Sequence, residues 1–146
     1  MNAKFSIRPA ASDAAETLAT LHHDSFGMEK WSLEQMQGSL ALPTTKAWLA
    51  YDGDLPVGFI LCQALPEETE ILTFCVSTTR RREHIGEFLL RQAMSEAKDG
   101  KIFLEVAADN LAARKLYEKL GFTVTGTRVN YYKRGAVTAN AVVYSA

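Results

Sequence analysis

Apolar positions along the chain recur with two spacings, every second residue and every third or fourth residue, which are typical of strands and helices respectively. Alternating or continuous apolar runs predict strands at residues 4–8, 46–51, 55–63, 69–76, 101–106, 122–132 and 137–144. Helical spacing predicts helices at 12–23, from 32, from 85 and at 111–120. Antiparallel hairpins therefore flank one central strand–helix–strand unit, and this order predicts an α+β fold of helices layered on a sheet.

Short polar signals mark where several of these elements begin and end. Ser12 is placed to cap the first helix, and Ser32 with Gln35 three residues later forms a capping box for the second. Asp52-Gly53-Asp54 separates two apolar runs and predicts a tight hairpin turn. Gly121 is expected to end the last helix, because glycine readily adopts the left-handed conformation found there.

Composition and charge narrow the class of protein. With 47% hydrophobic and 23% charged residues, the chain resembles a soluble globular protein. A net charge of -1 gives no overall basic field to attract nucleic acid. No repeat, low-complexity tract or linker is evident, so we expect residues 1–146 to form a single domain. The sequence shows no apolar leader and no run near the ~20 apolar residues of a membrane span, so we expect a soluble cytoplasmic protein.

The two cysteines, Cys62 and Cys75, each lie in an apolar run. They have neither CxxC spacing nor a nearby histidine, so we expect small buried core residues rather than a disulfide. Nothing in the spacing of potential ligands predicts a metal site.

A basic turn, residues 80–82, follows a buried strand and precedes the helix that starts near Ile85. A helix N-terminus presents unpaired N–H groups and the positive end of a dipole, so it binds anions. Arg81 and Arg82 add positive charge there, and Gly86 would let a ligand approach the backbone. A phosphate or pyrophosphate is therefore a natural ligand, although a solvated basic turn explains the charges alone equally well.

The stretch from Val76 to Leu90 resembles motif A of the GNAT (Gcn5-related N-acetyltransferase) superfamily, whose pattern is R/Q-x-x-G-x-G/A. Arg81 takes the first position and Gly86 the last, whereas His84 replaces the middle glycine. Histidine accepts a positive φ angle better than most side chains but less freely than glycine. The loop can therefore still wrap a phosphate, with some strain; a metal-binding or basic role for His84 is the weaker alternative.

The resemblance covers nearly the whole chain. Leu104–Phe122 is similar to the second half of the GNAT core. Residues 24–32 together with Arg128–Tyr132 resemble one branch, the bacterial ribosomal-protein S18 alanine N-acetyltransferases. The likeness implies a layered α/β sandwich whose mixed, mostly antiparallel sheet has helices on both faces. It also implies acetyl-CoA as the co-substrate and a protein N-terminus, that of S18, as the acceptor.

For the cofactor, the resemblance implies three groups of contacts. The pyrophosphate would be bound by Arg81, Arg82, Glu83, His84, Ile85, Gly86 and Glu87. The backbone of Phe74, Cys75 and Val76 would pair with the pantetheine arm and hold the thioester carbonyl, because the family's strand diverges from its neighbour there. Asn110 has the position of a helix N-cap, and the resemblance adds a contact to pantetheine.

Acetyl transfer to an amine needs a base for the amine proton and an acid for the departing sulfur. Glu105 lies in the apolar strand KIFLEVA and falls on the family's base position; from the pattern alone, an alternating strand could simply turn it to solvent. Tyr117 falls on the family's usual general acid, although the pattern alone favours one more aromatic residue on the core face of its helix. A covalent route through Cys75 would need a neighbouring base that the sequence does not show.

The acceptor side is marked by aromatic residues outside clear core periodicity. Trp31 and Tyr131, the latter beside Tyr132, fall where the branch holds its N-terminal peptide, and Trp31 could equally be a hydrophobic plug. We expect His22 and His23 on a helix surface.

Three functions remain open at this point. The leading hypothesis is direct acetyl transfer, in a ternary complex, to the N-terminal alanine of ribosomal protein S18. The second is a related enzyme that acts on another amine, such as a lysine side chain or a small metabolite. The third is a non-catalytic acyl-CoA-binding module, which the histidine in the phosphate loop favours and the retained Glu105 and Tyr117 disfavour.

Overall fold

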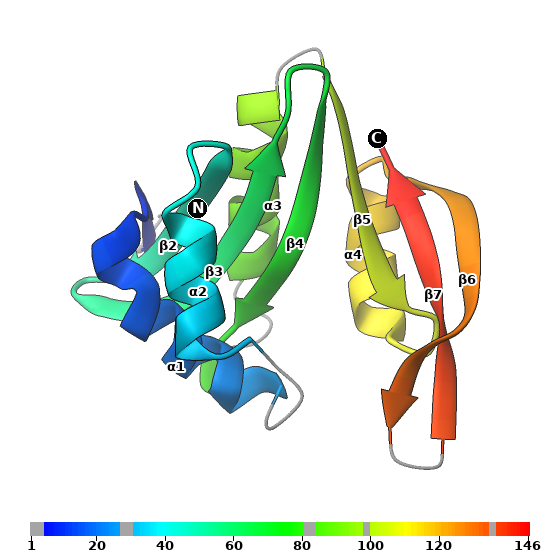
Figure 1. The fold of residues 1–146 in the computed structure, drawn as a ribbon, viewed down its shortest axis with the longest axis horizontal. Coiled ribbons are helices and arrows are strands. Elements are labelled where there is room, and N and C mark those ends of the chain that lie inside the picture. Colours follow the sequence, from blue (N-terminus) through cyan, green and yellow to red (C-terminus); the bar gives the residue numbers. More distant parts are fainter. Residues whose placement is uncertain (1–4, 27–30, 81–83, 98–99, 135–136) are drawn as a thin grey trace.

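The computed structural model describes residues 5–26, 31–80, 84–97, 100–134 and 137–146. Within these ranges the strands form one sheet in the order β1-β2-β3-β4-β5-β7-β6 (Figure 1). The strands are β1 (Phe5–Pro9), β2 (Thr45–Asp52), β3 (Leu55–Ala64), β4 (Glu68–Val76), β5 (Lys101–Ala107), β6 (Thr123–Arg134) and β7 (Val137–Ser145). The helices are α1 (Ala15–Phe26), α2 (Leu33–Leu40), α3 (Ile85–Ala97) and α4 (Leu111–Lys119). The chain order of strands and helices is the predicted one, which confirms the α+β fold.

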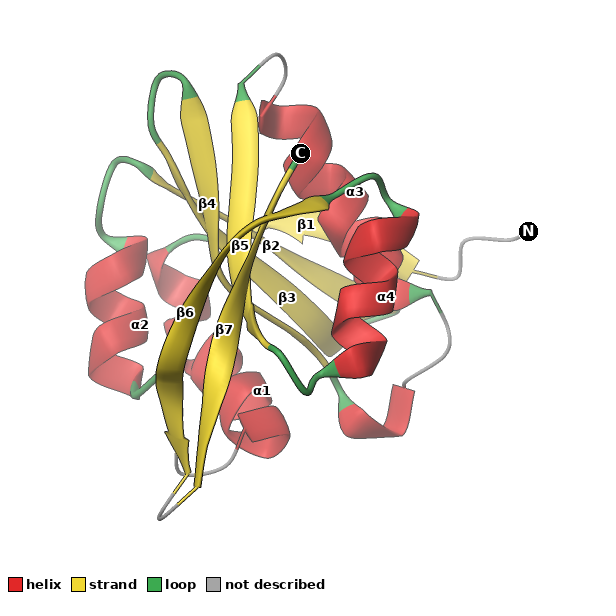
Figure 2. Cartoon of the chain, turned by 90° about the vertical axis from the view of Figure 1, so that its right-hand side faces the viewer, coloured by secondary structure: helices red, strands yellow, loops and turns green. Residues whose placement is uncertain are grey.

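Helices cover both faces of the sheet, with α1 and α2 on one face and α3 and α4 on the other (Figure 2). Strands β2 and β3 are buried on both faces. Trp48 and Ile60 join the core beneath α3 and α4, whereas Leu49 and Phe59 join the core beneath α1 and α2. Of the described strand pairs, β4–β5 is parallel and the others are antiparallel. The implied mixed, mostly antiparallel sheet with helices on both faces is confirmed.

Most of the predicted end signals are confirmed. The Ser32 hydroxyl accepts a hydrogen bond from the Gln35 N–H at 3.1 Å, and the Ser32 N–H donates to Gln35 Oε1 at 2.8 Å, which closes the capping box. Gly53 has φ 62° in the turn between β2 and β3, and Gly121 has φ 97° after α4.

The prediction that Ser12 caps the first helix is wrong. Ser12 begins a short 3-10 turn, η1 (Ser12–Ala14), whose N-cap is Ala11, and α1 itself starts at Ala15. The Ala15 N–H bonds to the Ser12 carbonyl, so Ser12 contributes its backbone oxygen from inside the turn.

Gly58 on β3 allows α3 to pack closely on the sheet. A Cβ atom at Gly58 would lie 2.9 Å from the Cys75 carbonyl oxygen and 3.2 Å from Leu89 Cδ1. Because the first of these is a backbone atom, we expect Gly58→Ala to lower the free energy of unfolding by about 1–3 kcal/mol. Gly38→Ala in α2 is the control, since nothing lies within 4 Å of its added Cβ, and it should stabilise by about 0.5–1 kcal/mol. Urea unfolding of both variants checks this; an equal effect of the two would disprove the close approach.

Both cysteines are buried thiols, one in each core. Burial raises the pKa of the Cys62 thiol to about 12. That thiol therefore stays protonated at neutral pH, as expected of a core residue rather than a nucleophile.

Two further features of the described residues bear on function. No helix there combines the length and apolar character that a membrane crossing requires. Nor do three or more histidine, cysteine or acidic side chains gather there as a metal site.

Candidate active site

The parallel strands β4 and β5 pair at one end and diverge at the other (Figure 1). Their register ends at Ile71 and Leu104, whereas the strands continue to Val76 and Ala107. Beyond Ile71, the edge of β4 that faces β5 has no strand partner among the described residues, although its other edge pairs with β3. Phe74, Cys75 and Val76 lie on this open edge. An extended ligand can bond to such an edge as another strand would.

Helix α3 begins next to the open edge with amide groups that precede its own hydrogen-bond ladder. Its first helical bond runs from the Phe88 N–H to the His84 carbonyl, 3.1 Å. The N–H groups of Ile85, Gly86 and Glu87 come before it and are suited to bind an anion. Arg81, Arg82 and Glu83, which were also expected to bind the pyrophosphate, lie outside the described residues.

Gly86 has a packing role that the sequence did not reveal. A Cβ atom there would lie 3.3 Å from Phe74 Cζ, 3.5 Å from Leu116 Cδ2 and 3.6 Å from Val76 Cγ2. The first turn of α3 is thus packed against β4 and α4 together. Close ligand approach at Gly86 stays a prediction, since packing alone already favours glycine.

His84 has φ 66°, in the left-handed region that favours glycine. The sequence indicated that the residue replacing the motif's middle glycine must tolerate a positive φ angle, and the backbone conformation confirms it. A side chain in this region costs roughly 1–2 kcal/mol. The histidine side chain is 59% exposed, so no packing opposes its replacement.

We expect His84→Gly to raise the free energy of unfolding by up to about 1 kcal/mol. The loss of left-handed strain outweighs the ~0.5–1 kcal/mol that glycine costs through its freedom in the unfolded chain. His23→Gly is the matched control, because exposed His23 lies inside α1, and it should destabilise by roughly 0.5–1 kcal/mol. Denaturant titration distinguishes them; a loss of stability in both would show that His84 is unstrained.

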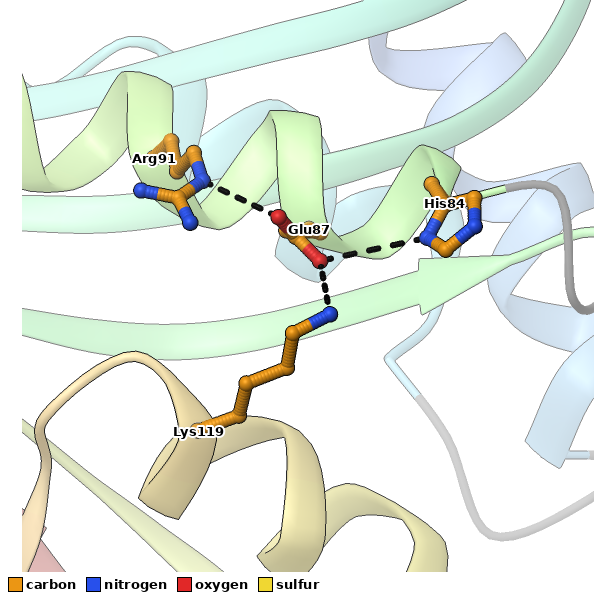
Figure 3. Close-up of polar contacts among 4 residues, drawn as sticks. All are labelled: His84, Glu87, Arg91 and Lys119. Atoms are coloured by element: carbon orange, nitrogen blue, oxygen red, sulfur yellow. Dashed lines mark hydrogen bonds and ion pairs between the residues drawn. The ribbon is translucent and has the colours of Figure 1, made fainter.

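The Glu87 side chain contacts the side chains of Lys119, Arg91 and His84 (Figure 3). Its Oε1 accepts from Lys119 Nζ at 2.7 Å and lies 3.9 Å from His84 Nδ1, while Oε2 accepts from Arg91 Nε at 3.1 Å. The hydrogen bond from Lys119 lowers the pKa of the Glu87 carboxyl, and that from Arg91 acts in the same direction. The carboxylate therefore stays charged and joins α3 to α4. It would repel phosphate, so the part predicted for Glu87 falls to its backbone N–H.

The Arg80 side chain is partly buried, 17% exposed. Its guanidinium donates to Asp52 Oδ2 at 2.6 Å and lies 5.7 Å from the centre of the Phe5 ring. This joins η2 (Thr78–Arg80) to the β2–β3 hairpin. Of the arginine run, Arg80 therefore anchors the start of the loop.

Tyr117 on α4 is 7% exposed and packs in an aromatic cluster. Its ring centre lies 6.4 Å from that of Phe74, 5.9 Å from Phe122 and 5.8 Å from Tyr144. The core position that the pattern favoured is confirmed. The contact with Phe74 also places Tyr117 beside the open edge of β4. The position therefore suits a core residue and a general acid alike, and the acid role stays a prediction.

Helix α4 is fixed at both ends. Asn110 Oδ1 accepts from the Ala113 N–H at 3.3 Å, which confirms the predicted N-cap. On the buried side, the Tyr144 hydroxyl donates to Glu118 Oε2 at 2.7 Å and accepts from Arg114 Nε at 2.9 Å. These bonds hold α4, and with it Tyr117, against β7. The pantetheine contact of Asn110 stays a prediction.

Glu105 on β5 is 15% exposed, so it does not simply face solvent. It points to the opposite face from Leu104 and Val106, which lie in the core beneath α3 and α4. Its Oε1 lies 3.0 Å from Arg128 Nη2, and its Oε2 is buried with no hydrogen-bond partner among the described residues. Glu105 and Tyr117 therefore flank the divergent strands from opposite faces.

Glu70 on β4 is a second carboxylate near Glu105, and the sequence pattern did not single it out. Burial raises the pKa of the Glu70 carboxyl, the negative charge of Glu105 raises it further, and Arg128 lowers it. Two carboxylates and one guanidinium make this side of the divergence favour a cation such as an ammonium group. The sequence could have indicated this pair of carboxylates, because each of the two parallel strands has a glutamate on the face opposite its core residues.

The two predicted acceptor residues lie in different surroundings. Tyr131 is 50% exposed, and the Arg128 guanidinium lies 5.1 Å from its ring centre. Because the same guanidinium contacts Glu105, Tyr131 lies near Glu105. Trp31 packs against the core beneath α1 and α2 and lines a shallow hollow beside Thr20. The peptide-binding roles stay predictions, and the side chain of Tyr132 lies outside the described part of the chain.

The surface prediction is wrong for His22. Its side chain is buried, 4% exposed, with its ring centre 6.1 Å from that of Phe59. It lies one turn after buried Leu18, on the face of α1 that packs on the sheet. His23 is exposed, as expected.

The match to a known family covers most of the chain. Residues 13–122 match the model of the Acetyltransferase (GNAT) family, and the chain belongs to that family. It is 33% identical over 124 residues to the N-alpha-acetyltransferase RimI of Mycobacterium tuberculosis, covering 82% of this chain and 78% of that protein. It is 34% identical over 91 residues to the ribosomal protein bS18-alanine N-acetyltransferase of Haemophilus influenzae, covering 60% of this chain and 62% of that protein.

A solved structure shares the fold. The crystal structure of the ribosomal-protein-S18-alanine N-acetyltransferase of Escherichia coli superposes with a TM-score of 0.90 at 21% identity, over 97% of this chain and 92% of that one. The protein is thus an acetyltransferase of the GNAT family and uses acetyl-CoA as its acetyl donor.

Proposed function

We propose that the protein acetylates the α-amine of a protein N-terminus in the cytoplasm, with the N-terminal alanine of ribosomal protein S18 as its substrate. The observation that carries the proposal is the position of Glu105 at the divergence of β4 and β5: a largely buried carboxylate, one oxygen of which has no hydrogen-bond partner among the described residues. The names of both relatives, an N-alpha-acetyltransferase and an S18-alanine acetyltransferase, support this acceptor.

The residues at the open edge fit acetyl-CoA. The N–H groups of 85–87 bind the pyrophosphate, helped by the positive charges of Arg81 and Arg82. The edge of β4 at 74–76, beyond its pairing with β5, bonds to the amides of the pantetheine arm, and Asn110 contacts the same arm from the start of α4. Acetyl-CoA, when bound, supplies the acetyl group as an activated thioester.

Glu105 and Tyr117 then divide the proton transfers. An N-terminal amine has a pKa of about 7.7–8.0, so roughly a tenth to a sixth of it is neutral at pH 7. Glu105 accepts the proton that the amine loses, directly or through a water, while the nitrogen bonds to the acetyl carbon. Tyr117 gives its phenol proton to the sulfur as the carbon–sulfur bond breaks. The amide and the free thiol of CoA are the products, and no step needs a covalent acetyl-enzyme.

The proton donation by Tyr117 is feasible in energy. A phenol of pKa ~10 and a thiol of pKa ~8.5 differ by ~1.5 units, or about 2 kcal/mol for complete transfer. A hydrogen bond from the phenol to the developing negative charge on sulfur already lowers the barrier.

A panel of acceptors tests the proposal. We expect acetyl-CoA turnover with a peptide of the S18 N-terminus, and mass spectrometry should locate the acetyl group on its α-nitrogen. The same peptide with a blocked N-terminus is the control and should be inert. Faster acetylation of a lysine side chain or a small amine would assign a different acceptor, and tight CoA binding with no turnover on any amine would indicate a binding module.

A further inference from the structure

Arg128 reaches Glu105 across an intervening strand. In the sheet, Glu105 is paired with Val143 and Arg128 with Ala141, both on β7. Val143 and Ala141 are two residues apart, so Arg128 and Glu105 lie on the same face. The Arg128 side chain crosses β7 over that face and ends with its Nη2 3.0 Å from Glu105 Oε1.

A bulge in β6 follows Arg128 directly. The register with β7 is interrupted between Arg128 and Tyr132, and Asn130 has φ 55°. The Asn130 N–H donates to Asn140 Oδ1 at 2.9 Å, and the Thr138 hydroxyl donates to Asn130 Oδ1 at 2.8 Å. Side chains of β7 thus bond to both the backbone and the side chain of Asn130 and fix the shape of the bulge. Bulges of this kind commonly re-aim side chains beside functional sites.

The bulge also brings Tyr131 against Arg128. The guanidinium lies 5.1 Å from the Tyr131 ring centre, within cation–π range. Arg128 is 57% exposed, and an ion pair so open to solvent adds little to folding stability. Folding stability alone therefore does not explain why Arg128 contacts the carboxylate of Glu105, which is only 15% exposed.

We propose that Arg128 is a positioning residue of the acceptor site: it holds Glu105 Oε1, so that Oε2 is the oxygen that accepts the amine proton. This inference rests on the proposed function, because it concerns the same proton transfer. A carboxylate held at one oxygen keeps the other in a fixed direction, and such positioning is a large part of catalysis.

Arg128 also sets the charge around the base. The charged or titratable groups that the structure places near Glu105 are Glu70 on β4 and Arg128 and Tyr131 on β6. Without the guanidinium, Glu70 and Glu105 face each other as like charges, which favours the protonated form of each. The base would then become active only at higher pH.

The test compares Arg128→Gln and Arg128→Lys with the wild-type protein. The measurements are kcat/KM for the S18 N-terminal peptide from about pH 5 to about pH 9, and an NMR titration of the Glu105 carboxyl carbon, assigned by its loss in Glu105→Gln. We expect Arg128→Gln to lower kcat/KM at least ~10-fold and to move the acid limb and the NMR midpoint to higher pH. Arg128→Lys, which keeps the charge, should recover most of both.

Arg8→Gln is the matched control. It removes the same charge from exposed Arg8 on β1, at the far edge of the sheet from β6, and should change neither measurement. If the wild-type protein is active and Arg128→Gln has the same acid limb and NMR midpoint, the inference is overturned and the proposed function stays intact. A loss of rate with no shift and no recovery by lysine indicates a structural residue and overturns it too. A wild-type protein that acetylates no N-terminal amine overturns both.

Discussion

Glu105→Gln should lower kcat for peptide acetylation by about 10²–10⁴-fold, the usual contribution of a positioned base. The affinity for acetyl-CoA should stay nearly unchanged, because Glu105 lies on the face of β5 opposite the core of α3 and α4. Glutamine keeps the size of the side chain and can still accept a bond from Arg128, so the fold should be retained. Stopped-time peptide assays and calorimetric CoA titrations measure the two quantities.

The pH dependence distinguishes a base from a merely polar residue. The acid limb of the kcat/KM profile should disappear or move in Glu105→Gln, since the titrating group is gone. Glu96→Gln, in an exposed position of α3, is the control and should match the wild-type profile. A Glu105→Gln profile that keeps the wild-type acid limb would show that another group accepts the proton.

Tyr117→Phe should slow the chemical step by roughly 10–100-fold, because it removes the proton donor to sulfur. The ring contacts with Phe74, Phe122 and Tyr144 remain, so the fold should be retained. Tyr117→Ala, by contrast, empties a buried site and should cost about 3–5 kcal/mol. Single-turnover rates and thermal unfolding separate chemistry from packing.

Tyr144→Phe is the matched control for this pair. Its hydroxyl bonds to Glu118 and Arg114, so its loss should lower the free energy of unfolding by about 1–3 kcal/mol while slowing acetylation much less than Tyr117→Phe. A Tyr117→Phe protein that unfolds early but turns over normally would make Tyr117 a core residue only.

Local sequence information predicted the elements well because their causes are local. Apolar spacing identified the strands and helices, and short polar signals such as Ser32 with Gln35 set their ends. The position of His84 in a spaced motif even indicated its positive φ angle. Ser12 was misjudged because the chain enters α1 through a 3-10 turn, a detail of backbone path that one serine does not determine.

The candidate site was predicted less completely because its contacts are not local. Arg128 contacts Glu105 because β7 lies between β5 and β6 in the sheet. The spacing of apolar residues does not determine this strand order. Glu70 joins Arg128 and Glu105 only through the parallel register of β4 and β5. His22 was misplaced for a similar reason, since the buried face of α1 depends on how the helix docks.

A crystal structure with a CoA–peptide conjugate, in which the acetyl carbon is bonded to both sulfur and the peptide α-nitrogen, tests the acetyl-transfer proposal most directly. We predict the pyrophosphate at the amides of 85–87, the pantetheine along 74–76, and the nitrogen about 2.6–3.2 Å from Glu105 or one water away. A peptide chain leaving on the face of α3 and α4, with Glu105 out of reach of the nitrogen, would contradict the proposal.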